Sequence, residues 1–173
     1  MDLLQRFARG EIDAFETLVR QFQGDIYSWI VRIVRDPGTA EDLTLETLWR
    51  VYRARQQFRP GGNFGAWARR IATNLAIDHL RRKRREESLL AEPVGSPQPD
   101  RVLQQETREK IQLAFRRLPA KLQVPAMLAL VEERSYEEIA DALGTSVGAV
   151  KQRVFRAVRI LREKLTKLGV RPQ

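Results

Sequence analysis

The sequence contains no cysteine and a single histidine, His79, among its 173 residues. Without cysteine the chain forms no disulfide and no thiolate metal site, so packing alone must stabilise the fold. No stretch reaches the roughly 18 apolar residues of a membrane span, and the beginning of the chain carries acids and lacks a continuous apolar core for export. We therefore expect a cytoplasmic protein with no membrane insertion.

Residues for catalysis are equally scarce. The sequence has no glycine-rich phosphate motif and no cluster with metal-ligand spacing, and we expect His79 to be a structural or surface residue. The sequence therefore predicts no catalytic residue, no bound metal, no cofactor and no small-molecule substrate.

Positive charge is abundant and unevenly distributed. The 31 Lys and Arg residues exceed the 22 Asp and Glu residues, which gives a formal net charge of +9 and favours a polyanionic partner. Residues 1–85 hold 16 basic and 10 acidic side chains, residues 86–105 hold 1 and 4, and residues 106–173 hold 14 and 8. Two basic segments thus flank an acidic connector.

The acidic connector is also rich in helix breakers. Pro93, Gly95, Pro97 and Pro99 fall within a few residues of one another, where no periodic apolar pattern remains. We interpret residues 86–105 as a flexible linker between two domains, residues 1–85 and 106–173; the alternative is a surface loop within one domain.

Both basic segments have the apolar spacing of helices. Leu18, Phe22 and Ile26 recur at four-residue intervals in the first, and Phe115 and Leu118 continue the pattern in the second. No convincing alternation of the β type occurs. The predicted fold is therefore all-α, with two small helical domains.

A helix is predicted over residues 39–53. Thr39 followed by Asp42 has the form of an N-cap with acids in the first turn. On a helical wheel the expected inward face holds Leu45, Leu48, Trp49, Val51 and Tyr52, and the outward face holds Asp42, Glu46, Arg50 and Arg53. The outward face suits a protein partner; the alternative is simple i,i+4 ion pairing in solvent, such as Glu46 with Arg50.

The next predicted helix, from about residue 64 to 85, follows a loop of Arg59, Pro60, two glycines and Asn63. Trp67, Ile71 and Leu75 are expected to be buried, whereas the polar face beside them holds Arg70, Asn74, Asp78, Arg81 and Arg85. Five consecutive cations at 81–85 can pair with phosphates, and the amide of Asn74 can read a base edge. A solvated charged face is the alternative.

The most specific local pattern lies in residues 135–165. Ser135 and Glu138 form a capping box before a short helix, and Gly144 then opens a tight turn. The following helix has its expected core side at Val147, Val150, Val154, Val158, Leu161 and Leu165. This is the spacing of a helix-turn-helix, whose second helix enters the major groove.

The exposed side of that second helix is predicted to carry the DNA-reading groups Lys151, Gln152, Arg153, Phe155, Arg156 and Arg159. Phe155 lies off the apolar stripe, which favours a DNA contact over its alternative, packing against the preceding helix. The alternative for the whole segment is a basic helical hairpin that binds no DNA.

Taken in order, these segments resemble the extracytoplasmic-function (ECF) sigma factors, the two-domain bacterial transcription initiation factors. The resemblance rests on DAFETLVRQF, GTAEDLTLETLWRVYRARQQF, FGAWARRIATNLAIDHLRRKRR, LPAKLQVPAMLAL and SYEEIADALGTSVGAVKQRVFRAVRILREKL. It covers nearly the whole chain. It implies a protein that binds core RNA polymerase and directs it to promoter DNA, with an anti-sigma factor as a further partner.

The resemblance also implies roles for individual residues. Polymerase docking would fall to Asp42, Leu43, Glu46, Trp49 and Arg50. Recognition and opening of the promoter element near minus ten would fall to Arg59, Asn63, Phe64, Asn74, Asp78, Arg81, Arg82 and Arg85, with Trp67 mainly in the core. Recognition of the element near minus thirty-five would fall to Lys151, Gln152, Arg153, Phe155 and Arg156.

Three positions depart from the usual family pattern. Leu45 stands where the family commonly has Gln, Gln152 replaces a frequent Ser, and Val158 replaces a frequent Arg. The upstream promoter sequence is therefore not carried over from relatives.

Two other functions fit the composition. A stand-alone helix-turn-helix regulator would bind operator DNA as a dimer and use residues 1–85 for sensing or dimerisation. A basic scaffold or RNA-binding protein would bind without sequence preference, although the acidic start of helix 39–53 argues against it. We expect a free monomer.

Overall fold

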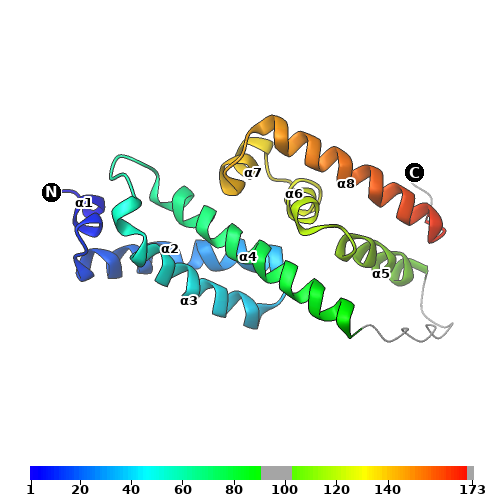
Figure 1. Ribbon diagram of the computed structural model, residues 1–173, viewed down its shortest axis with the longest axis horizontal. Coiled ribbons are helices and arrows are strands. Elements are labelled where there is room, and N and C mark those ends of the chain that lie inside the picture. The colour runs from blue at the N-terminus through cyan, green and yellow to red at the C-terminus, as the bar shows by residue number, and fades with distance from the viewer. Residues whose placement is uncertain (91–102, 171–173) are drawn as a thin grey trace. The chain divides into compact units, whose positions relative to one another are not determined.

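The computed structural model describes residues 1–90 and 103–170, and within these ranges it contains helices and no strand (Figure 1). The predicted all-α fold is confirmed. We group the helices before residue 91 as the first unit: α1 (Leu3–Ala8), α2 (Ile12–Val34), α3 (Pro37–Arg53), the 3-10 turn η1 (Arg55–Gln57) and α4 (Phe64–Leu89). A second unit contains α5 (Leu103–Arg116), α6 (Ala120–Leu130), α7 (Tyr136–Leu143) and α8 (Val147–Lys167).

The predicted linker, residues 86–105, is helical at both ends. Helix α4 continues through Leu89, four residues past the expected boundary, and α5 begins at Leu103. Residues 91–102, with the prolines and glycine that suggested a linker, lie outside the described residues. None of the helices in the described ranges is long and apolar enough to cross a membrane.

The junction between α2 and α3 corrects one predicted cap. Helix α2 ends at Val34, and the residue that caps it, Arg35, has a left-handed backbone at φ 58°. Asp36, and not Thr39, is the N-cap of α3, because its carboxylate accepts a hydrogen bond from the Thr39 N–H at 2.9 Å. Pro37 then occupies the first helical position, where its missing N–H costs nothing. Helix α3 therefore begins at Pro37, two residues before the predicted start at residue 39.

The buried face of α3 differs from the predicted one. It consists of Ala40, Leu43, Thr44, Thr47, Leu48 and Val51. Leu45 and Trp49, expected inside, are 68% and 56% exposed. The threonines can be buried because Thr44 Oγ1 donates to the Ala40 carbonyl at 2.6 Å and Thr47 Oγ1 to the Leu43 carbonyl at 2.7 Å. Their hydroxyls are thus satisfied within the helix, which leaves small side chains against the core.

The core of the first unit is aromatic at the end near α1. Phe7, Phe58 and Phe64 are buried, and Trp67 is half-buried beside them. The Trp67 ring centroid lies 5.0 Å from that of Phe58 and 6.0 Å from that of Phe64. Trp67 thus packs in the core cluster, as predicted.

The second unit is organised around α8. Val150, Val154, Ala157 and Leu161 of α8 are buried, and Ala157 and Leu161 pack in one cluster with Leu118. Val147, Val158 and Leu165, also predicted inside, are partly buried.

The turn between α7 and α8 has the predicted glycine. Ser135 Oγ accepts a hydrogen bond from the Glu138 N–H at 3.1 Å, so the cap of α7 forms as expected. At the other end of α7, Gly144 adopts φ 63°, the Thr145 N–H donates to Ala140 and the Gly144 N–H donates to Asp141. This is the Schellman ending of a helix, which sets the tight turn of the helix-turn-helix.

Gly24 lies in the interior of α2, and a β-carbon added there would have no other atom within 4 Å. We expect Gly24→Ala to raise the free energy of unfolding by about 0.5–1 kcal/mol, because alanine loses less backbone entropy in a helix. All three tryptophans (Trp29, Trp49 and Trp67) belong to the first unit, so urea unfolding followed by tryptophan fluorescence measures this unit.

Gly65→Ala is the matched control. A β-carbon at Gly65 would meet Phe22 Cε1 at 3.0 Å, so this variant should be less stable than the parent protein. Stabilisation by Gly65→Ala, or destabilisation by Gly24→Ala, would contradict the packing described for α2 and α4.

Candidate nucleic-acid and partner interfaces

One outward face of α3 combines apolar and charged groups. Leu45 and Trp49, four residues apart and therefore neighbours on the helix surface, are both exposed, and Asp42 and Arg50 are exposed on the same helix. Glu46 is half-buried, and its Oε1 accepts a hydrogen bond from Arg50 Nε at 2.8 Å. The ion pair expected for a solvated helix therefore forms, but two large apolar side chains lie exposed on the same helix.

Leu43 does not belong to that face. Its side chain is 7% exposed and lies on the buried stripe of α3. Its role in polymerase docking stays a prediction. Leu45 is the residue that sequence reasoning missed here. Its exposure could have been inferred only by recognising that Thr44 and Thr47 face the core.

The polar face of α4 lies where the sequence predicts. Arg70, Asn74 and Asp78 are exposed, Arg81 is half-buried, and residues 82–90 are all exposed, including Arg82 and Arg85. Their spacing places Arg70, Asn74 and Asp78 successive turns apart along one side of the helix. This side offers donors for phosphates and an amide for a base edge.

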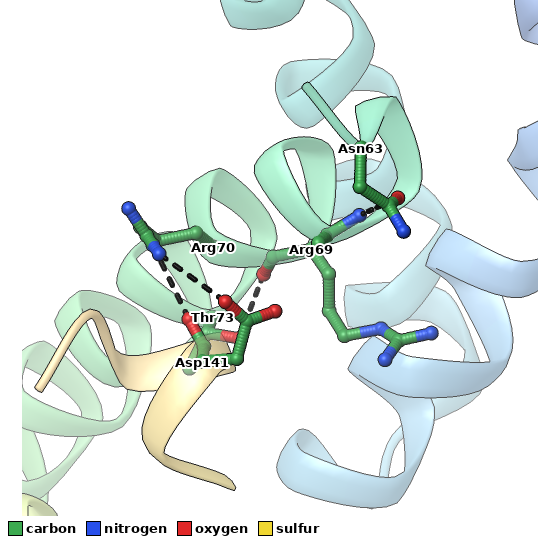
Figure 2. A network of polar contacts seen from close by, with 6 residues as sticks. Asn63, Arg69, Arg70, Thr73 and Asp141 are labelled. Carbon is green, nitrogen blue, oxygen red and sulfur yellow. Dashed lines mark hydrogen bonds and ion pairs between the residues drawn. The ribbon is translucent and has the colours of Figure 1, made fainter. Parts of the chain in front are cut away.

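The loop before α4, residues 59–63, is exposed, whereas the first residue of α4 is buried. Arg59 and Asn63 are exposed, whereas Phe64 is 4% exposed within the aromatic cluster. The free chain thus buries Phe64, and its predicted role at the minus-ten element stays a prediction. Asn63 also has a structural role, because its Oδ1 accepts from the Ala66 N–H at 3.0 Å and caps α4 (Figure 2). The amide –NH2 of Asn63 is a separate group that can donate.

A buried hydrogen bond fixes α4 against α2. Trp29 Nε1 of α2 donates to Thr73 Oγ1 of α4 at 2.8 Å, and the Thr73 hydroxyl donates in turn to the Arg69 carbonyl at 2.7 Å. The Arg69 guanidinium lies over the Trp29 ring, with its Cζ 4.8 Å from the ring centroid. Figure 2 shows Arg69 and Thr73 one turn apart on α4. These contacts set the rotation of α4 and thus which residues it exposes.

The outer face of α8 is exposed and basic. Lys151, Gln152, Phe155, Arg156 and Arg159 are exposed, and Arg153 is half-buried. Phe155 is 71% exposed, so its alternative, packing against the preceding helix, is not what the structure shows. An exposed phenyl ring among four cations and an amide matches a major-groove reading helix, where apolar groups contact the thymine methyl and cations contact phosphates and guanine.

Family models match both halves of the chain. Residues 18–86 match Sigma-70 region 2, and residues 108–161 match Sigma-70 region 4. The chain is 31% identical to the ECF RNA polymerase sigma factor SigW of Bacillus subtilis over 95% of this chain and 96% of SigW. This chain belongs to the ECF RNA polymerase sigma factors. The predicted resemblance is confirmed.

Two further ECF sigma factors are longer than this chain. BldN of Streptomyces coelicolor is 36% identical over 93% of this chain and 64% of BldN, and SigE of Mycolicibacterium smegmatis is 34% identical over 89% of this chain and 62% of SigE. The sigma factor described here thus spans a little under two thirds of the length of these two relatives.

Solved structures share the fold. CnrH, solved in complex with the cytosolic domain of CnrY, matches with a TM-score of 0.60 and 22% identity over 95% of this chain and 96% of CnrH. The sigma factor RpoE, solved with the anti-sigma factor NepR from Bartonella quintana, matches with a TM-score of 0.54 and 23% identity over 88% of this chain and 96% of RpoE. At this identity the likeness establishes the fold.

The Trp29–Thr73 hydrogen bond predicts a specific pattern of stabilities. Thr73→Val should lower the free energy of unfolding of the first unit by about 1–3 kcal/mol, because it leaves the buried Trp29 N–H without this acceptor. Thr73→Ser keeps the hydroxyl, so its free energy of unfolding should fall by less than that of Thr73→Val. Urea unfolding followed by tryptophan fluorescence measures both, and a serine variant no more stable than the valine variant would contradict the role given to this bond.

Proposed function

We propose that this sigma factor binds core RNA polymerase and directs promoter-specific transcription initiation. The observation that carries the proposal is the presence of separate exposed surfaces suited to DNA, on α4 and on α8, in a chain that belongs to the ECF family. We assign residues 1–85 to polymerase docking and the element near minus ten, and residues 106–173 to the element near minus thirty-five. Residues 86–105 join the two in this proposal.

The polymerase-docking surface in this proposal is the outer face of α3. Asp42 and Glu46 provide negative charge, and the exposed Leu45 and Trp49 provide apolar area that a partner can bury. Exposed tryptophan is a frequent centre of binding energy at interfaces. Leu45, where the family commonly has Gln, would make this contact more apolar than in most relatives.

Recognition near minus ten uses the loop before α4 and the polar face of α4. Along the sequence, Arg59 and Asn63 of the loop are followed on α4 by Asn74, Asp78 and the cations at 81–85. Amide and carboxylate groups can read an unstacked base, and arginines can hold the phosphates beside it. Binding energy then offsets the few kcal/mol that flipping a base costs.

Recognition near minus thirty-five uses α8. Lys151, Arg153 and Arg156 provide donors for phosphates and guanine, Gln152 suits adenine, and Phe155 provides apolar contact. The function is physical rather than covalent, and the proposal assigns no catalytic residue to the chain.

An anti-sigma factor is a further proposed partner. RpoE and CnrH, which share the fold, were each solved in a complex, RpoE with the anti-sigma factor NepR and CnrH with the cytosolic domain of CnrY. We infer that this chain, too, binds such a partner, an anti-sigma factor that would cover its two domains. In this proposal the chain acts in the cytoplasm, where it meets the polymerase.

Transcription with purified core polymerase tests the proposal. Core polymerase with the chain, given a pool of promoter fragments, should initiate from fragments that share two separated elements, and core polymerase alone should not. Tight, symmetric operator binding without polymerase affinity would instead establish a stand-alone regulator.

Charge reversal on α3 should abolish polymerase association. The double variant Asp42→Lys with Glu46→Lys changes an exposed and a half-buried carboxylate on the outer face of α3, so the fold should remain intact. Binding to core polymerase is measured by fluorescence anisotropy, with circular dichroism as the test of folding. Glu16→Lys with Asp25→Lys, on exposed positions of α2, makes the same charge change and should bind normally. Equal affinity of the two double variants would place the docking surface elsewhere.

Truncation of cations on α8 should weaken binding of the upstream element. Lys151→Ala and Arg156→Ala should each reduce promoter use and lower the slope of log affinity against log salt by about one unit when a phosphate contact is lost. Arg162→Ala and Lys167→Ala, exposed further along α8, are controls with the same charge loss. Promoter use and salt dependence unchanged in the first pair would contradict the assignment of α8.

A further inference from the structure

Helix α1 packs against both ends of the loop at residues 59–63. Phe7 of α1 is fully buried, and its ring centroid lies 6.2 Å from that of Phe58 and 5.4 Å from that of Phe64. Phe58 is the residue before the loop, and Phe64 is the residue after it. Phe7 therefore contacts the two residues from which the loop leaves and re-enters the core.

The same aromatic cluster joins the two ends of the loop to each other. The Phe58 and Phe64 rings lie 5.7 Å apart, and both pack on Trp67, with the Phe7 ring 6.4 Å from Trp67. Aromatic pairs at these separations stabilise a fold beyond the apolar area that they bury. The two ends of the loop are thus held together by this buried aromatic cluster. Arg59 and Asn63 of the loop are exposed to solvent.

A second contact ties the end of α1 to the segment before the loop. Gly10, at φ 88°, approaches Arg55 of η1 so closely that a β-carbon there would lie 2.9 Å from Arg55 Nε. Arg55 is itself fixed, because its Nη1 donates to the Tyr52 carbonyl at 3.0 Å and its guanidinium lies over the Tyr52 ring. The turn after α1 therefore packs on the segment from Tyr52 to Arg55, which precedes the loop.

The loop itself has little to hold its conformation. It contains Pro60, Gly61 and Gly62, and within it the Gly62 N–H donates to the Arg59 carbonyl at 2.8 Å. Two adjacent glycines give this segment a large conformational entropy to lose when it binds DNA. Supports outside the loop that restrict its conformation would lower that cost.

We propose that α1 is a brace that preorganises the loop at 59–63 for DNA, with Phe7 as its positioning residue. Helix α1 lies outside residues 18–86, the part of the chain that matches Sigma-70 region 2. The brace therefore adds a support from beyond the matched region. Its role in DNA opening rests on the function proposed above, whereas its effect on the loop is measurable in the free protein.

Hydrogen exchange of the free chain tests the brace itself. Phe7→Ala should raise the exchange rate of the Gly62 and Ala66 amides roughly tenfold, because opening of the loop becomes easier, while amides in the half of α2 beyond Gly24 change little. Phe7→Leu, which keeps most of the apolar volume, should recover most of the protection.

Ile30→Ala is the matched control. Ile30 is also fully buried, but it lies about 12 Å further along α2 than Phe22, the last α2 residue of the aromatic cluster. In Ile30→Ala, the amide exchange rate should rise in α2 rather than at Gly62. Equal exchange at Gly62 in Phe7→Ala and Ile30→Ala, or no recovery in Phe7→Leu, would overturn the proposal.

Promoter opening tests the functional consequence. In complexes with core polymerase, Phe7→Ala and Gly10→Ala should bind polymerase normally but open promoter DNA several-fold more slowly, whereas Phe7→Leu should open it at close to the parent rate. Opening is followed by the fluorescence of 2-aminopurine in the element near minus ten. Normal opening rates in Phe7→Ala and Gly10→Ala, together with faster exchange at Gly62, would overturn the part of the proposal that concerns DNA. If the parent chain does not bind polymerase, the proposed function fails, and the exchange result still decides whether α1 braces the loop.

Discussion

The hydrogen bond between Trp29 and Thr73 is the constraint on which the arrangement of the first unit depends. It joins α2 to α4 in the buried core, and the Thr73 hydroxyl donates a second hydrogen bond to the Arg69 carbonyl. A buried N–H left without an acceptor is costly, so the helices are held at the one rotation that satisfies it. Since α3 also packs on α2, the orientations of the outer face of α3 and of the polar face of α4 both depend on α2.

The helices and most of the exposed surfaces could be predicted from the sequence. Apolar residues at three and four residue spacing are typical of helices wherever they occur, and prolines and glycines mark where they break. The basic outer face of α8 and the polar face of α4 were predicted because charged side chains are seldom buried. The exposure of Phe155 was predicted correctly because the residue lies outside a clear apolar stripe.

Errors arose where small polar residues face the core. A helical wheel that treats threonine as polar places Leu45 and Trp49 inside α3, but the hydroxyls of Thr44 and Thr47 bond to their own helix and can be buried. Phe64 was assigned to DNA by its position in the family resemblance, whereas an aromatic cluster assembled from distant segments buries it in the structure. Such contacts depend on tertiary structure and leave no local signal in the sequence.

The central claim is that two helical units of one chain read two separate promoter elements within a polymerase complex. Site-specific photo-crosslinking from Asn74 and from Phe155 in that complex tests it directly. We expect that Asn74 crosslinks to DNA near minus ten, that Phe155 crosslinks near minus thirty-five, and that both crosslinks require core polymerase. Crosslinks from both positions to one contiguous operator in the absence of polymerase would contradict it.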